Sequence, residues 1–360
     1  MAVLIISQIL LYLCFALIMG SFLLSLVPQL YRPNIYVPHK GLLAAVAGIP
    51  IFSFIPVLQI IVYLVPKTGF WNTVQSVLMT FELGIAWGFT FIISIILFIF
   101  LCLFNYQQKV FHSTIGIFLT FLLILAIGWS SHASSIDQVW GFISDTIHFT
   151  AVSVWVGILI VVSWFSINHR NWLNFLKWFT PVAIVCFLST LITGLILMSF
   201  VVPDYMNSWL ISYGQALLIK HLFIIPLLLY AAINSIFIKK RLRKSTDFNP
   251  KPWAKLESVI ILFIFSATAV LGQQSPPNEV SILPGNTSKL FTLIYHGQIQ
   301  REMTVQLSLN ATSTTFIALA FLFGILMIIS FIKQAPAIMS FFMSVLLVVC
   351  AYFSLILSVV

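Results

Sequence analysis

Two ionisable side chains, Asp145 and His148, stand three residues apart inside a long apolar stretch. Residues at this spacing share one face of a helix, so the carboxylate can hold the imidazole in one tautomer and raise its basicity. A neutral imidazole held in this way is a common metal ligand. In a helix that begins near Trp140, Asp145 and His148 would lie about 8 Å and 12 Å along the axis. We therefore predict that His148 binds a metal ion and that Asp145 orients it.

Other ionisable or metal-ligating residues in or beside apolar stretches extend this candidate site. A charge near the centre of a bilayer costs at least about 2.5–3.5 kcal/mol, so such residues are functional more often than not. Lys220 and His221 would lie about 17 Å, and Glu82 about 10 Å, into their helices. All are expected in the outer half of the membrane, with nothing comparable in the inner half. The predicted metal ligands are His148, His221, Asp145, Glu82, His132 and Met198.

The types of donor atom in this set favour copper. Imidazole and thioether suit copper, whereas zinc prefers a closed tetrahedral set with more histidine or cysteine. Two alternatives stay open. The ionisable residues could form a buried ion-pair network that only locks the helices together, with Lys220 paired to Asp145 or Glu82. Alternatively, His148 and His221 could be the axial ligands of one haem on facing helices.

The composition of the chain requires a lipid environment for these residues. Hydrophobic residues make up 61% of the 360 residues and charged residues only 7%, and the mean hydropathy is +1.11. A soluble domain carries about 25% charged residues, because water-facing groups must cover it. A helix that crosses a bilayer needs about 20 apolar residues. We therefore predict an all-α polytopic transmembrane bundle with about ten helices.

Apolar stretches of sufficient length define the expected spans. They cover residues 2–28, 42–65, 75–104, 114–131, 140–165, 173–200, 209–238, 254–272, 314–333 and 337–358. The chain then divides into N-terminal helices over 1–139, a core over 140–277, an extracytoplasmic loop over 278–313 and the last helices over 314–360. Within the loop, partial alternation of apolar and polar residues on both sides of Gly297 predicts a small β-hairpin.

Lysine and arginine residues are divided unevenly between the predicted loops. With the N-terminus outside, the inner loops hold thirteen of the 17 and the outer loops hold three. Seven of the thirteen lie between Lys239 and Lys255. Cytoplasmic loops carry such an excess, so we predict that both termini are extracytoplasmic and that residues 239–255 are cytoplasmic. The net charge of +9 therefore indicates orientation in the membrane rather than nucleic-acid binding.

Motifs for several kinds of chemistry are missing from the sequence. It contains no P-loop, no intramembrane Cys-Pro-Cys and no Asp-Lys-Thr-Gly, so ATP hydrolysis is not expected. The four cysteines lie in apolar stretches without a CxxC pair, which implies neither a disulfide framework nor a zinc site. No nucleophile–base pair for hydrolysis stands out. We therefore expect a protein that is not an enzyme.

Short motifs on four consecutive predicted helices resemble those of the copper resistance protein D (CopD) family. They are Asp145-Thr-Ile-His148 with Trp155-Val-Gly157, then Thr193-Gly194, then Gly214, Lys220 and Ala232-Ile-Asn234, and last Gly272-Gln-Gln-Ser-Pro276-Pro277. The resemblance covers about residues 140–277. It gives His148 the position of a family histidine, with Trp155 and Gly157 as structural residues beside it.

The resemblance implies a membrane protein that moves copper, often beside a CopC-like extracytoplasmic copper-binding partner. Our first hypothesis is therefore copper transport across the plasma membrane, directed inward and serving copper homeostasis or resistance. A haem-binding electron-transfer protein that uses His148 and His221 is one alternative. A factor that presents copper to another membrane complex is the other. No nucleic-acid partner is expected.

Overall fold

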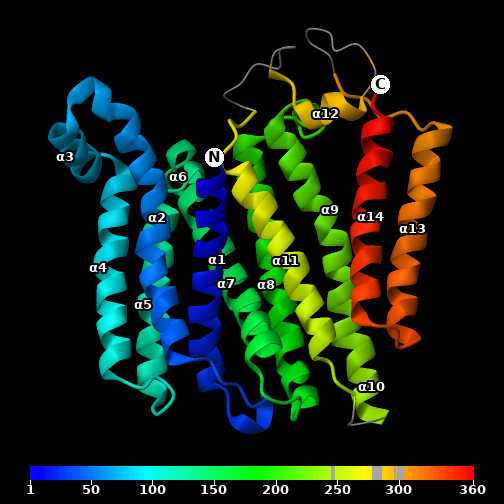
Figure 1. Ribbon diagram of the computed structural model, residues 1–360, viewed down its shortest axis with the longest axis horizontal. Helices are drawn as coiled ribbons and strands as arrows, with labels where there is room; N and C mark the ends of the chain where they lie inside the picture. The colour runs from blue at the N-terminus through cyan, green and yellow to red at the C-terminus, as the bar shows by residue number, and fades with distance from the viewer. Residues whose placement is uncertain (245–247, 278–285, 296, 298–303) are drawn as a thin grey trace. The chain divides into compact units, whose positions relative to one another are not determined.

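A computed structural model describes residues 1–244, 248–277, 286–295, 297 and 304–360 (Figure 1). The described ranges form helices joined by short connections, without a strand, and contain two isolated antiparallel β-bridges. Ten helices in these ranges are long and apolar enough to cross a membrane. The prediction of an all-α polytopic transmembrane bundle is thereby confirmed.

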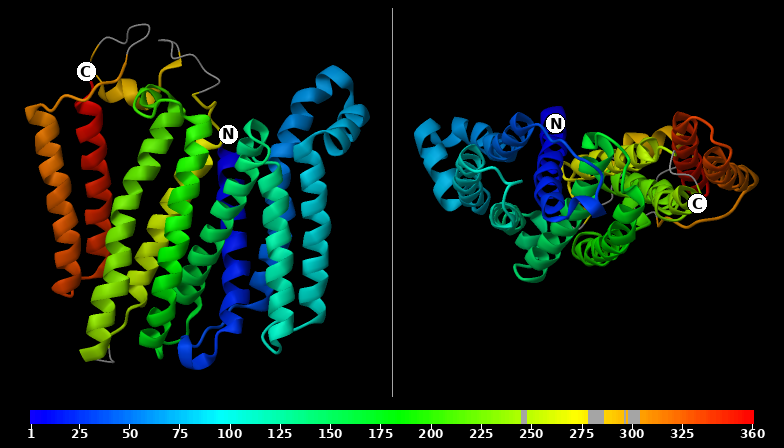
Figure 2. Two further views of the ribbon diagram at one scale, coloured as in Figure 1. Left: turned by 180° about the vertical axis from the view of Figure 1, so that it is seen from behind. Right: turned by 90° about the horizontal axis from the view of Figure 1, so that it is seen from below.

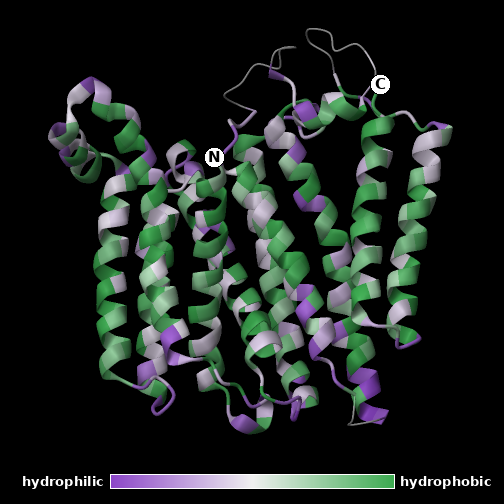
Figure 3. Cartoon of the chain, viewed as in Figure 1, coloured by the Kyte–Doolittle hydropathy of each residue, from purple (hydrophilic) through white to green (hydrophobic). Residues whose placement is uncertain are grey.

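The distribution of polar residues explains why the chain adopts this architecture. Figure 3 shows hydrophobic residues along the length of the long helices, while hydrophilic residues gather towards helix ends and connections. In a bilayer, every backbone N–H and C=O group must find its partner within the protein, and a helix achieves this within one segment. The sequence-based spans therefore agree with the helices to within a few residues, with one exception described below.

The chain divides into two compact units, residues 1–200 and residues 201–360. The helices of the first unit are α1 (Ala2–Leu26), α2 (His39–Thr68), α3 (Phe70–Thr80), α4 (Glu82–Leu103), α5 (Val110–Trp129), α6 (His132–Ile136), α7 (Trp140–Phe165) and α8 (Trp172–Val201). Helix α1 packs against α7, α2 and α5. The division of the chain into four segments stays a prediction.

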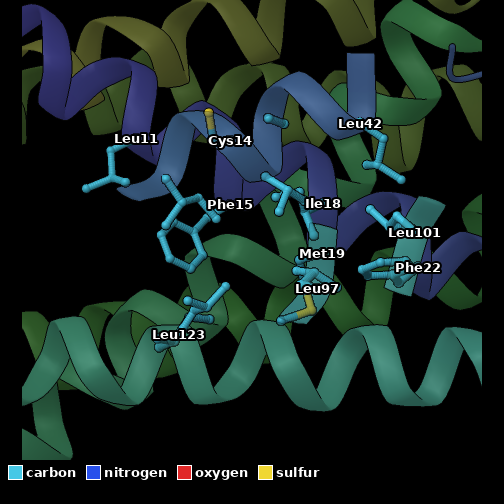
Figure 4. Packing of buried hydrophobic residues seen from close by; sticks show 14 of the residues in the cluster. Leu11, Cys14, Phe15, Ile18, Met19, Phe22, Leu42, Leu97, Leu101 and Leu123 are labelled. Carbon is cyan, nitrogen blue, oxygen red and sulfur yellow. The ribbon is translucent and has the colours of Figure 1, made fainter. Parts of the chain in front are cut away.

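The core of the first unit is built around one face of α1. Phe15, Ile18 and Phe22, spaced three or four residues apart, are fully buried. Figure 4 shows these side chains near Leu97 of α4 and Leu123 of α5. The spacing follows the helical repeat, so a single face of α1 supplies the contacts that hold the neighbouring helices.

Helices α1 and α7 touch through their backbones. A Cβ atom added to Gly20 would overlap the carbonyl group of Gly157, and one added to Gly157 would overlap the carbonyl oxygen of Ala16. Small residues four apart, here Ala16 and Gly20, allow this close approach between membrane helices. Gly157 therefore lies where α7 approaches the backbone of α1 most closely, and its predicted structural role stays a prediction.

The predicted single helix over 75–104 is wrong, because the structure breaks it at Phe81. This residue has an extended backbone (φ −81°, ψ 132°), which ends α3 and begins α4. Gly84 lies directly against the backbone of Val77, and a Cβ atom there would overlap the Val77 carbonyl group. Glu82 consequently lies exposed in the first turn of α4 rather than about 10 Å along a continuous helix.

The second unit contains the last helices of the chain. They are α9 (Ser212–Ala232), α10 (Ile238–Lys244), α11 (Lys251–Leu271), α12 (Lys289–Ile294), α13 (Ala311–Ile332) and α14 (Ala337–Leu357). A π-helical segment, Ile233–Phe237, joins α9 to α10 without a break. Helix α9 packs against α11 and α14, and α13 packs along α14, the orange and red helices in Figure 2.

The β-hairpin predicted in the loop over 278–313 is not formed in its described part. Residues Lys289–Ile294 form α12 in place of the first arm of the hairpin. The Ser288 hydroxyl accepts a hydrogen bond from the backbone N–H of Leu290, and the side chain of Phe291 is fully buried. This cap and anchor favour a helical turn. Residues 296 and 298–303, which include part of the predicted turn and second arm, lie outside the described residues.

Candidate functional site

His148 is hydrogen-bonded to the next membrane helix. Its Nδ1 atom lies 3.1 Å from the hydroxyl oxygen of Thr193 on α8. Thr193 is buried, and His148 is half-buried on α7, eight residues after the first residue of that helix. The two residues belong to the same unit and to different motifs of the CopD resemblance. The structure therefore brings the predicted ligand together with a residue that the sequence analysis did not assign to the site.

The hydrogen bonds of Thr193 determine which imidazole nitrogen carries the proton. The threonine hydroxyl has one hydrogen, and it is donated to the backbone carbonyl of Ser189 at 2.7 Å. The same oxygen must then accept from His148, so Nδ1 is the protonated nitrogen and Nε2 holds the lone pair. Metal-binding histidines are commonly oriented by such a bond from the second nitrogen. This tautomer is the one in which Nε2 could act as a metal ligand.

Gly194 leaves room beside the ring of His148. A Cβ atom added to this glycine would lie 3.5 Å from the Cε1 atom of His148 and 3.8 Å from its Nδ1 atom. Side chains larger than alanine would extend from this point towards the imidazole. The Thr193-Gly194 pair therefore serves His148 in two ways, because one residue binds the ring and the other makes space for it.

Asp145 lies on the same helix, close to α1. Its carboxylate interacts electrostatically with Tyr12, whose hydroxyl accepts a hydrogen bond from Gln8 at 3.0 Å. The aromatic ring of Phe149 packs edge-on against Tyr12, with ring centroids 5.7 Å apart. Polar groups of α1 therefore face the turn of α7 that precedes His148. The orienting role of Asp145 stays a prediction, since the bond described for Nδ1 is with Thr193.

Trp155 supports α7 on its α8 side. The indole is buried and meets the ring of Phe187 edge-on, with centroids 6.0 Å apart. Trp155 lies seven residues after His148, so both side chains project from one face of α7. This face contacts α8, while Gly157 fits the opposite side of α7 against α1. Trp155 and Gly157 therefore contact neighbouring helices on two sides of α7, and their structural roles stay predictions.

The remaining candidates of the first unit come from three different helices. Glu82 begins α4, and His132 is exposed at the start of the short helix α6. Met198 is half-buried on α8, five residues after Thr193. Among the described residues, no group of three or more His, Cys, Asp or Glu side chains could hold a metal ion.

His221 has a different environment in the second unit. Its Nδ1 atom lies 2.8 Å from the hydroxyl of Tyr205, which belongs to the connection before α9. Burial raises the pKa of Tyr205 to about 12, so its side chain is a neutral phenol at physiological pH. Lys220, the preceding residue, is half-buried. Since His148 and His221 belong to different units, the convergence of the candidates on one cavity stays a prediction.

A network of neutral side chains holds α9 beside His221. Gln215, which is 2% exposed, donates to the backbone carbonyl of Trp209 at 2.5 Å and accepts from the hydroxyl of Tyr352 on α14. Buried polar groups that are fully bonded in this way fix the register of helices. The network therefore sets the position from which Lys220 and His221 project.

One buried ionisable residue was missed by the sequence analysis. Glu257 on α11 is 3% exposed and accepts a hydrogen bond of 2.6 Å from the side-chain amide of Asn234. It lies six residues after the start of α11, near the end that the sequence analysis assigned to the cytoplasmic side. The signal was present, because a lone acidic residue lies inside the stretch predicted as a membrane span over 254–272.

Comparison with known proteins matches one segment of the chain to a protein family. Residues 173–271, which run from α8 to α11, match the family model described as Copper resistance protein D. This matched stretch, residues 173–271, is called the CopD segment. The protein described as Copper transport protein CutJ, from Bacillus subtilis (strain 168), is 28% identical over 165 residues. That alignment covers 44% of this chain and 30% of the relative. No solved structure matches the chain.

The CopD segment is shorter than the region of resemblance seen in the sequence. It contains Thr193, His221, Asn234 and Glu257, whereas His148 on α7 precedes it. The hydrogen bond between His148 and Thr193 therefore joins a helix outside the segment to the first helix inside it.

Proposed function

We propose that this chain transports copper across the plasma membrane in the inward direction, with His148 as a ligand of the moving ion. The observation that carries this proposal is the hydrogen bond from Nδ1 of His148 to Thr193, because it leaves the lone pair on Nε2. Copper is the cargo that the matched CopD segment and the name of the relative CutJ favour. Imidazole is also a donor that suits copper. On this account the chain is a transporter rather than an enzyme.

The inward direction is inferred from where the ionisable residues lie. Asp145 and His148 follow the first residue of α7 by five and eight residues, about 8 Å and 12 Å along the helix. The distribution of lysine and arginine makes that end of α7 the extracytoplasmic end. A ligand near the outer surface is suited to receive copper from outside, including from a CopC-like partner. Asp145 would lower the energy of a cation at this depth.

Replacement of Thr193 by valine tests the role of the hydrogen bond. The variant keeps the shape of the side chain and removes the acceptor for His148 Nδ1. Loss of an orienting group of this kind typically weakens metal affinity about 10–100-fold. We expect a reduction of this size in copper binding by the purified protein, and reduced copper accumulation in cells that express it.

Thr190→Val is the matched control for this experiment. Thr190 lies on the same helix, and its hydroxyl is bonded to the backbone carbonyl of Cys186 at 2.8 Å. We expect this variant to bind and accumulate copper as the unmodified protein does. Equal copper affinity in Thr193→Val and Thr190→Val would contradict the proposed role of Thr193.

The orientation of the chain is a separate prediction. Lys244 ends α10 within the basic stretch, which we expect to face the cytoplasm. In a cysteine-free background, Lys244→Cys should resist a membrane-impermeant maleimide in intact cells and react after the membrane is permeabilised. Trp71→Cys is the control, because Trp71 is exposed on α3, and it should react in intact cells. Labelling of Lys244→Cys from outside would contradict the orientation.

Two other functions receive less support. Neither the CopD segment nor the name of the relative favours haem ligation by His148 and His221. Visible absorbance of the purified protein tests this alternative directly. A factor that only presents copper to another complex would bind the ion without raising the copper content of cells, so the accumulation assay separates it from a transporter.

A further inference from the structure

Glu257 and Asn234 form a buried polar pair in the second unit. Glu257 lies six residues after the start of α11, about 9 Å along the helix. Asn234 lies in the π-helical segment that follows α9 and is 9% exposed. Its Nδ2 atom donates to Oε2 of Glu257 at 2.6 Å and to the backbone carbonyl of Trp253 at 3.3 Å. The pair thus joins α9 to α11 through a carboxyl group and an amide.

Asn234 is the partner described for the carboxyl group of Glu257. Lys251 and Lys255 precede Glu257 on α11 by six and two residues. The basic residues of α10 begin five residues after Asn234. An ionised carboxylate buried without a partner is strongly disfavoured, so the neutral acid becomes the competing form.

Other titratable groups on the helices packed against α11 lie elsewhere. On α9, the hydroxyl of Tyr230 donates to Ser340 of α14 at 3.2 Å, and Tyr213, Lys220 and His221 lie further from Asn234 along the helix. On α14, Cys350 and Tyr352 follow Ser340 by ten or more residues, about 15 Å or more. The π-helical segment has no titratable side chain. Asn234 is therefore the side chain whose hydrogen bond depends on the charge of Glu257.

The second polar atom of Asn234 gives the pair its proton-binding geometry. Oδ1 is buried and has no hydrogen-bond partner among the described residues. A carboxylate accepts from Nδ2, as the structure shows, and a neutral carboxyl group could donate to Oδ1 after the amide turns over. The two orientations of an amide have nearly the same shape, so both fit the same space. The two arrangements of the pair differ by a single proton on Glu257.

The π-helical segment adds an independent indication of function. Such segments are rare and occur frequently at functional sites, because the wider turn displaces side chains and loosens the backbone ladder. Here the segment begins one residue before Asn234.

We propose that Glu257 and Asn234 form a proton-binding site that opens towards the cytoplasmic side and exchanges one proton for each copper ion transported. Glu257 takes up a proton as the neutral acid and releases it as the carboxylate, and the Asn234 amide turns to match each form. The binding of the proton stands on the geometry of the pair alone. Its coupling to copper rests on the proposed function.

Reaction with dicyclohexylcarbodiimide tests the proton-binding step on the full-length protein without copper. The carboxyl oxygen of a protonated acid adds to the central carbon of this apolar reagent, the acidic proton passes to a nitrogen, and an acylurea forms. We expect mass spectrometry to find the adduct on Glu257, with a yield that falls as pH is raised. No adduct on Glu257 at any pH, or a yield that does not change with pH, would overturn the site.

Variants at the two positions extend this measurement. Glu257→Gln should lose the adduct at position 257. Asn234→Leu removes the donor to the carboxylate, which disfavours the ionised form, so labelling should persist to higher pH. Asn174→Leu, at a half-buried asparagine of α8 whose amide donates to the Leu30 carbonyl, is the matched control and should leave the pH dependence unchanged. An unchanged pH dependence in a folded Asn234→Leu protein would show that Asn234 does not influence the protonation of Glu257.

Proteoliposomes that contain a pH-sensitive dye test the coupling separately. Addition of copper outside should change the internal pH in vesicles with the unmodified protein but not in vesicles with Glu257→Gln. Copper entry without proton movement would overturn the coupling and leave the proposed function intact. Absence of copper entry would contradict the proposed function, while the labelling result would still decide the proton site.

Discussion

Replacement of His148 by glutamine is expected to reduce copper accumulation to the level of cells without the protein. Glutamine has a similar size and can still hydrogen-bond to Thr193, but its amide is a poor copper ligand. The helix should therefore remain in place while the ligand is lost. Whole-cell copper content, normalised to the amount of membrane-inserted protein, measures the effect.

His112→Gln is the matched control for this variant. His112 is half-buried at the start of α5, and its Nδ1 atom lies 3.1 Å from the backbone carbonyl of Asn105. We expect copper accumulation by this variant to equal that of the unmodified protein. Normal accumulation by a well-expressed His148→Gln protein would remove His148 from the transport pathway and leave it a role in packing.

Substitution of Gly157 by leucine is expected to have the largest effect on stability. The new side chain would overlap the backbone of α1 at Ala16, where no rotamer can relieve the contact. Overpacking of a tight interface typically costs about 1–3 kcal/mol, and a clash with backbone lies at or above the upper end of that range. We expect a large loss of folded protein and a lower midpoint of thermal unfolding in detergent.

Gly88→Leu separates this effect from the general consequences of losing a glycine. A Cβ atom at Gly88, inside α4, would meet no atom within 4 Å apart from its two chain neighbours and the backbone of its own helix. Leucine also favours helix formation over glycine, by about 0.8–1.0 kcal/mol at most. Gly88→Leu should therefore fold at least as well as the unmodified protein. Equal thermal stability of the two variants would mean that α1 and α7 are not held by the Gly20–Gly157 contact.

The membrane spans could be predicted from the sequence because they depend on local composition. An apolar stretch of sufficient length forms a helix in lipid wherever it packs, so α1 and α7 agree closely with the expected 2–28 and 140–165. The break at Phe81 could not be predicted in this way. It depends on the fit of Gly84 against the backbone of Val77, which is a contact between two helices.

The candidate site shows the same division between local and tertiary information. His148 was found because an imidazole in an apolar stretch is conspicuous. Its partner Thr193 is 45 residues away along the chain, and threonine is unremarkable in a membrane helix. The role of Glu257 also depends on a distant residue, since Asn234 contacts it across 23 residues of sequence. Spacing along one helix favoured Asp145 as the partner of His148, which stays a prediction, and the fold adds Thr193 from a different helix.

Copper entry into proteoliposomes tests the central claim most directly. Purified full-length protein and its His148→Gln variant would be reconstituted side by side, with copper(I) held reduced by ascorbate in one arm and copper(II) in the other. The account predicts that the unmodified protein admits one of these ions faster than protein-free vesicles do, and that His148→Gln does not. Failure of the folded protein to admit copper in either arm, or equal entry through His148→Gln, would contradict it.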